Sequence, residues 1–207
     1  MSFLEKQDLI RQANKMLSDS EGPFSLLLLV KGVVQGVGFR PFVYRIAKER
    51  SLTGEVSNNA HGVEIRISGG KSDILSFLGK LQASAPPLSV LREIHLEKIA
   101  PVPYTSFKIK ESERGNTFEI DITADIATCP LCLEEMADVQ NPRYRYPFIN
   151  CTDCGPRYSI IKDLPYDRPE TTMSDFAMCP RCEQEYHDPD DRSEERRVGK
   201  ECRSRWS

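Results

Sequence analysis

The chain lacks the long apolar segments that a membrane span or an export signal requires. Its longest apolar run, Leu26 to Val30, is far too short to cross a bilayer. The N-terminal stretch MSFLEKQDLIRQANKMLSD is charged and has no apolar core of the kind found in signal peptides. We therefore expect a cytoplasmic protein with no membrane partner.

A surplus of positive charge is also missing. The net charge of −3 argues against a nucleic-acid partner, because neutralising phosphates requires an excess of Lys and Arg. The chain has no Walker loop, and no Ser-His-Asp or Cys-His arrangement is apparent. Its 207 residues, of which 39% are hydrophobic and 29% charged, predict one or two soluble globular domains.

Cysteine, by contrast, is abundant and regularly placed. Six of the seven cysteines form three Cys-x-x-Cys pairs, and eighteen residues separate the first pair from the second. Two such pairs can hold one tetrahedral metal ion, and the missing export signal favours reduced thiolates over disulfides. We therefore predict zinc as the cofactor. The candidate ligands are Cys129, Cys132, Cys151, Cys154, Cys179 and Cys182.

The pairing of these motifs has two solutions. We expect the first and second pairs to form one complete zinc site and the third pair to belong to a broken second unit. Because the first and third pairs share the pattern CPxC, a site formed by these two stays open. Redox activity of the pairs is disfavoured, since no βαβ pattern surrounds any of them.

Residues 24–110 alternate between strand and helix patterns. Strands are predicted at 24–34, 54–58 and 62–68, with a fourth around Ile94 and Leu96 and a short last one around Phe107 and Ile109. One helix is predicted at 40–50 and another around residues 74–81. The order β-α-β-β-α-β indicates an α+β, ferredoxin-like fold with both helices on one face of the sheet.

This pattern divides the chain into five parts. Residues 1–20 are expected to be an N-terminal extension, either a loose amphipathic helix or disordered. The dense Pro and turn residues after position 128 predict a small domain stabilised by metal in place of a large core. The expected boundaries are 1–20 for the extension, 21–112 for the α+β domain, 113–128 for a linker, 129–192 for the zinc region and 193–207 for an unrelated tail.

A glycine-rich loop joins the first strand to the first helix. Gly36 and Gly38 permit positive φ angles, and successive backbone N–H groups there can form an anion-binding nest. Arg40 follows at the start of the helix, where its guanidinium can contact phosphate oxygens. The glycine spacing alone also fits an ordinary turn before a helix with a solvated arginine.

The complete string narrows this choice. GVVQGVGFR followed by GEVSNNAHGVEI resembles the acylphosphatase signature over about residues 24–110. The resemblance implies that Arg40 and Asn58 are catalytic, with Asn58 positioning the attacking water; Asn59 is adjacent, but Asn58 matches the motif's register. It also implies a phosphate-binding loop that consists of Gln35, Gly36, Val37, Gly38, Phe39 and Arg40.

The cysteine region has a resemblance of its own. RYRYPFINCTDCGPR and LPYDRP are similar to the HypF family, the carbamoyltransferases of [NiFe]-hydrogenase maturation. The family implies cleavage of carbamoyl phosphate, use of ATP, and transfer of the carbamoyl group to the C-terminal cysteine of HypE. The modified cysteine is then the source of the cyanide ligands of the hydrogenase iron. Within this region we expect RYRYPF to form strands flanking a zinc ribbon, in preference to stacking on nucleotide bases.

The C-terminus departs from the family pattern. Glu201 and Ser204 stand where a fourth Cys-x-x-Cys is expected, with Cys202 alone between them. From Ser193 onward the resemblance ends, so we expect that this chain cleaves carbamoyl phosphate or another acyl phosphate but does not carbamoylate HypE. The alternatives are a non-catalytic zinc-containing protein-binding module and a stand-alone acylphosphatase.

Overall fold

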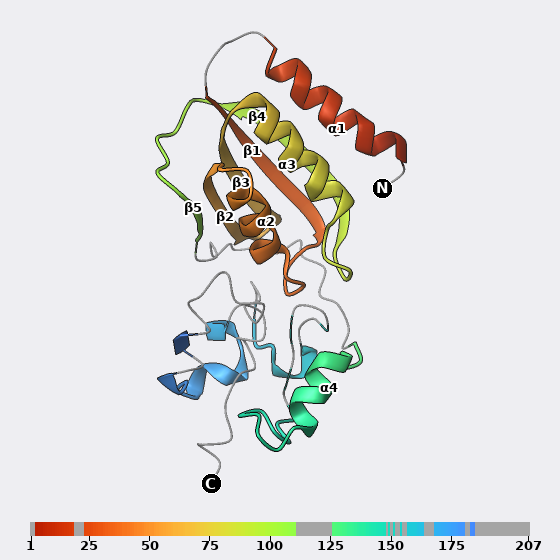
Figure 1. Cartoon of the computed structure of the whole chain (residues 1–207), viewed down its shortest axis with the longest axis vertical. Helices are drawn as coiled ribbons and strands as arrows, with labels where there is room; N and C mark the ends of the chain where they lie inside the picture. The colour runs from red at the N-terminus through yellow and green to blue at the C-terminus, as the bar shows by residue number, and fades with distance from the viewer. Residues whose placement is uncertain are drawn as a thin grey trace.

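The computed structural model describes most of the chain up to residue 184. The described residues are 3–18, 23–110, 126–147, 149, 151, 154, 157–163, 168–180 and 183–184. They form a sheet-and-helix unit that is followed by a smaller unit of one helix and irregular backbone (Figure 1). No helix in these ranges is both long enough and apolar enough to cross a membrane.

A five-stranded sheet is the framework of the first unit. Its strands lie in the order β4-β1-β3-β2-β5, and every neighbouring pair is antiparallel except β2 and β5, which are parallel. The strand bounds are Phe24–Val33 for β1, Thr53–Asn59 for β2, Gly62–Gly69 for β3, Val90–Ile99 for β4 and Phe107–Ile109 for β5.

Two helices cover one face of this sheet (Figure 1). They are α2, Phe39–Lys48, and α3, Lys71–Ala83, which also contact each other. Because side chains alternate across a strand, every second residue of the central strands β1 and β3 enters the core beneath them. These residues, all fully buried, are Leu26, Leu28, Val30, Val63, Ile65 and Ile67. The ferredoxin-like α+β prediction is confirmed.

The N-terminal extension is part of this core. Helix α1, Phe3–Met16, lies along α3 and contacts α3 and β4. Leu9, Ala13 and Leu17 stand four residues apart, so they share one side of the chain, and all three are buried in the main hydrophobic cluster. Of the two expectations, the amphipathic helix is confirmed for Phe3–Met16 and disorder is wrong for these residues. The helix is also not loose, because its apolar side packs into the core.

The second unit contains helix α4, Pro130–Ala137, and three short 3₁₀ helices. These are η1, Tyr158–Ile160, η2, Arg168–Glu170, and η3, Thr172–Asp175. The predicted strand pair at RYRYPF is wrong over the described residues 143–147, where residues 143–145 form a turn. Arg143 contacts Glu135 at 3.0 Å and Tyr146 packs with the cysteines, so these side chains face the inside of the unit. Phe148 lies outside the described residues.

Candidate active site and metal centre

The glycine loop takes the shape that its sequence predicts. Gly36 and Gly38 have φ angles of 74° and 75°, in the left-handed region that favours glycine. Gly38 is the N-cap of α2, and the first turn of this helix contains no acidic residue. The positive end of the helix dipole therefore remains available to an anion at this loop.

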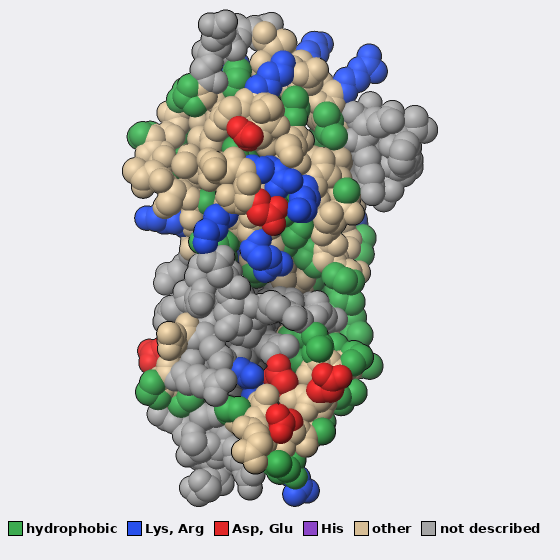
Figure 2. Space-filling model, in the orientation of Figure 1, with side chains coloured by type: hydrophobic (Ala, Val, Ile, Leu, Met, Phe, Trp, Pro, Cys, Tyr) green, Lys and Arg blue, Asp and Glu red, His purple; other side chains and the backbone are tan. Residues whose placement is uncertain are grey.

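One basic side chain adds to this electrostatic field. Helix α2 has no Asp or Glu, and Arg40 lies in its first turn, whereas its other basic residues, Arg45 and Lys48, lie in the last turn. Arg40 is the second residue of the helix and is partly exposed. Figure 2 shows Lys and Arg side chains gathered over the sheet-and-helix unit to which α2 belongs. At the loop itself, the helix dipole and Arg40 are the features that attract an anionic ligand.

The other predicted loop residues anchor the loop. Val37 and Phe39 are fully buried, and the ring of Phe39 lies 6.1 Å from that of Phe42. Gln35 is buried as well, and its Nε2 donates hydrogen bonds to the carbonyl oxygens of Asn59 and Gly62, at 3.0 and 2.9 Å. The loop therefore lies against the turn between β2 and β3.

Asn58 lies next to this contact. It is fully buried in β2, on the same face as Val56, and pairs across the ladder with Val63 of β3. Within the described part of the chain, neither its Oδ1 nor its Nδ2 has a hydrogen-bond partner. A buried unpaired polar atom costs about 1–3 kcal/mol, so such a group in a native protein calls for an explanation such as a bound ligand.

The side chain of the neighbouring Asn59 is engaged in the hairpin turn. Its Oδ1 accepts a hydrogen bond from the backbone N–H of His61 at 2.9 Å, which is an Asx turn at the tip of the hairpin. Asn58 alone of the two presents an unsatisfied amide on the helix-covered face.

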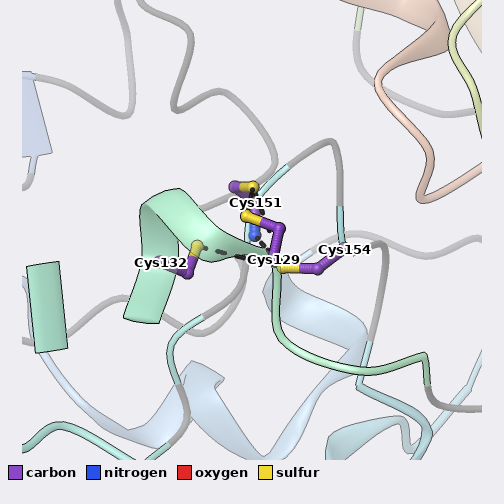
Figure 3. Close-up of side chains that lie close together, drawn as sticks. All are labelled: Cys129, Cys132, Cys151 and Cys154. Atoms are coloured by element: carbon purple, nitrogen blue, oxygen red, sulfur yellow. Dashed lines mark hydrogen bonds between the residues drawn. The ribbon is translucent and has the colours of Figure 1, made fainter. Parts of the chain in front are cut away.

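Four cysteines converge in the second unit (Figure 3). The sulfur atoms of Cys129, Cys132, Cys151 and Cys154 all lie within 4.8 Å of one another. Three of the separations are 3.4, 3.7 and 3.9 Å. Four sulfurs bound tetrahedrally at about 2.3 Å from one ion would stand about 3.8 Å apart, so this donor set fits a metal.

The thiols also share negative charge unequally. Hydrogen bonding with Cys151 and Cys154, together with burial, raises the pKa of Cys132. Hydrogen bonding from Cys132 and Cys151 lowers the pKa of Cys154, whose sulfur also accepts from the backbone N–H of Cys151 at 3.1 Å. A divalent cation at the centre would allow all four groups to be thiolates together.

Both units match known families. The acylphosphatase family model matches residues 26–109, and the HypF finger model matches residues 128–161. The probable carbamoyltransferase HypF of Methanocaldococcus jannaschii is 51% identical over 141 residues, which cover 67% of this chain and 18% of that protein. An acylphosphatase of Thermotoga petrophila is 38% identical over 87 residues, covering 42% of this chain and 96% of its own length.

A solved structure covers both units together. The crystal structure of full-length HypF in the phosphate- and nucleotide-bound form superposes with a TM-score of 0.77 at 44% identity, over 85% of this chain and 23% of that one. The chain belongs to the HypF family. It contains an acylphosphatase domain and a HypF finger, and it spans about a fifth of the length of the HypF relatives it matches.

Arg157 is a finger residue that the sequence analysis missed. Its guanidinium donates to the carbonyl oxygens of Ile126, Ile149 and Cys154 and to Oγ1 of Thr128, over 3.0–3.3 Å. It thus connects the segment before the first HypF cysteine pair to the segment that carries the second. Arginine is not a metal ligand, so only its place directly after CTDCGP could have drawn attention to it.

Of the third cysteine pair, the structure describes Cys179 alone, and this residue is outside the four-cysteine centre. Cys179 is partly exposed, while Cys182 lies outside the described residues. The structure therefore pairs the first HypF motif with the second. The alternative in which the first pairs with the third is not the arrangement that the chain adopts.

Proposed function

We propose that this chain hydrolyses acyl phosphates, and carbamoyl phosphate in particular, at the loop 35–40 and Asn58. One observation carries the proposal: a buried amide without partners in the described structure lies beside an anion-attracting helix N-terminus. The similarity of residues 26–109 to acylphosphatases supports the same site.

The chemistry needs little from the protein beyond positioning and charge. The loop N–H groups and Arg40 hold the phosphoryl oxygens, and Asn58 orients a water in line with the bond to the acyl oxygen. A new bond forms between water oxygen and phosphorus as that bond breaks, which releases phosphate and the carboxylate or carbamate. Because an acyl phosphate is an activated anhydride, a nucleophilic side chain is not required.

We further propose that this hydrolysis serves the HypF reaction. In that role the full-length enzyme joins the released carbamate to AMP from ATP, with pyrophosphate leaving. The carbamoyl group then passes from this adenylate to the C-terminal cysteine of HypE, AMP leaves, and the product is the source of the cyanide ligands of [NiFe]-hydrogenase. The similarity to a probable carbamoyltransferase supports this assignment. The clustered thiols suit a reducing compartment, and we place the protein in the cytoplasm.

We assign zinc to the four-cysteine centre. Four thiolates in a closed tetrahedral set are typical of structural zinc, since no position is left open for substrate. In this proposal Cys129, Cys132, Cys151 and Cys154 hold the ion and thereby fold the finger. Cys179 and Cys182 contribute no ligand to it.

Phosphate release from carbamoyl phosphate tests the proposed activity. Arg40→Ala should lose about a hundredfold or more in rate, because it removes a charge that stabilises the transferring phosphoryl group. Arg45→Ala is the matched control, since Arg45 is an exposed arginine on the same helix. Equal rates for the two variants would contradict the site. A wild-type chain without activity on carbamoyl, acetyl and benzoyl phosphate would favour the non-catalytic alternative.

A further inference from the structure

The phosphate loop and the strand with Asn58 come from different parts of the sheet. The β1–β3 ladder ends at Val30 and Val63, and beyond Val30 the residues of β1 pair with β4. The backbone ladder therefore stops short of the loop on the side of the β2–β3 hairpin. Hydrolysis requires the bound phosphoryl group and the water on Asn58 to keep one fixed geometry across this gap.

Gln35 bridges the gap with its side chain. Its Nε2 donates to the carbonyl oxygens on both sides of the hairpin turn, those of Asn59 and Gly62. Asn59 directly follows Asn58, so the contact is one residue from the proposed catalytic amide. Gly62 is pressed onto β1, because a Cβ there would collide with the carbonyl oxygen of Val30.

The orientation of the Gln35 amide follows from these contacts. Two carbonyl acceptors fix the NH₂ group toward the hairpin, because the reverse orientation would place oxygen against oxygen. Both Nε2 protons are thereby engaged, so this group is not the one that binds phosphate. The Oε1 atom is buried and has no partner among the described residues, a cost that the protein bears to keep the bridge.

We infer that Gln35 is a positioning residue that fixes the phosphate loop relative to Asn58. The inference rests on the proposed function and adds a positioning role for the side chain of Gln35, a residue of the expected phosphate-binding loop. Reacting atoms must approach to about 3–3.5 Å, and a misplacement of about 1 Å can cost about a hundredfold in rate. Gln35 acts on this distance through the hairpin, while the loop N–H groups and Arg40 hold the phosphoryl group by themselves.

The test compares wild type with Gln35→Met, which keeps the length of the side chain and removes both donors. We expect kcat on acetyl and carbamoyl phosphate to fall about tenfold to a hundredfold. Inhibition by inorganic phosphate, which reports the loop alone, should stay within about twofold. In Gln35→Glu, which replaces the donors with a carboxylate, kcat should fall at least as much. This second variant tests the inference if Gln35→Met does not fold. Gln82→Met is the control, because Gln82 is also buried but lies on α3.

A double-mutant cycle separates positioning from general loosening. In an Asn58→Ala background, Gln35→Met should cause little further loss, since the water that it helps to place is no longer held. Additive losses of the two substitutions in this cycle would overturn the inference. So would an unchanged kcat in Gln35→Met, or a weakening of phosphate inhibition in that variant as large as its loss of kcat. If wild type itself released no more phosphate than Arg40→Ala, the proposed function would fail and the inference with it.

Discussion

At the scale of single residues, the proposed site contains buried amide atoms that have no hydrogen-bond partner in the described structure. Of the five buried side-chain nitrogen and oxygen atoms without a partner in the described structure, three belong to Gln35 and Asn58. Such atoms lower stability, and we attribute the retention of the two at Asn58 to the water that this amide orients in the proposed reaction. Activity and stability are therefore expected to oppose each other at Asn58.

We predict that Asn58→Leu raises the stability and removes the activity. Leucine has a similar volume and leaves no unpaired polar atom, so the free energy of unfolding should rise by about 1 kcal/mol. The rate of phosphate release should fall about a hundredfold or more. Urea unfolding and the phosphate assay measure the two effects on the same preparation.

Gln82→Leu provides the comparison. Gln82 Nε2 is also buried without a partner in the described residues, but it lies on α3, outside the proposed site. This variant should gain stability and keep its activity. If Asn58→Leu lost stability while Gln82→Leu gained it, the Asn58 amide would have to be satisfied within the fold.

The motif predicts these residues only in part. The resemblance identifies Arg40 and Asn58 because the signature names positions in sequence. The bridge from Gln35 to the hairpin and the unpaired state of Asn58 depend on the meeting of segments more than twenty residues apart. Local sequence contains no information on which carbonyl groups will face a given side chain.

At the scale of secondary-structure elements, periodicity predicts the sheet and its two helices but not the docking of α1. The alternation of apolar and polar residues in β3 predicts a strand, and the spacing of apolar residues in α3 predicts a helix. The apolar positions of α1 are few, and whether they are covered depends on a distant surface of α3. The expected strands at RYRYPF do not form over the described residues 143–147, where Tyr146 packs with the cysteines and residues 143–145 form a turn.

Helix α1 should therefore contribute measurably to stability. Leu9 is buried against the core, so Leu9→Ala should lower the free energy of unfolding by about 2–4 kcal/mol. Its neighbour Ile10 is 36% exposed, so Ile10→Ala should cost less. Urea denaturation of both variants tests this, and equal small effects would show that α1 is not docked in solution.

The finger depends on Arg157 as well as on its cysteines. Arg157→Gln should weaken zinc binding about 10–100-fold, because groups that orient metal ligands contribute on that scale. Lys162→Gln, at an exposed lysine five residues away, should have no such effect. Competition with a chromogenic chelator measures both affinities, and an unaltered affinity in Arg157→Gln would refute the role of this residue.

At the scale of the whole molecule, two units are stabilised by different means. The sheet unit buries a large apolar core, whereas the finger's main cluster consists of three cysteines, Tyr146 and Ile149. So small a core is insufficient without metal. The composition predicts this contrast, since Pro and turn residues become frequent where the cysteines begin.

Metal removal should therefore unfold one unit and spare the other. With a strong chelator, amide hydrogen exchange should accelerate in residues 126–163 and stay unchanged in the sheet strands. Acidification should act in the same direction, because protonated thiols cannot bind zinc. Protection of the finger that survives complete metal removal would contradict this account.

In the proposed reaction, a water oriented by Asn58 attacks phosphorus in a phosphoryl group held by the loop 35–40. The most direct measurement is hydrolysis of carbamoyl phosphate in heavy-oxygen water, followed by mass spectrometry of the released phosphate. Arg40→Ala serves as the blank for spontaneous breakdown. The account predicts one heavy oxygen atom in each phosphate formed by the wild-type chain. Unlabelled phosphate, formed at a rate above the blank, would mean that the carbon–oxygen bond is broken and would contradict the assigned site.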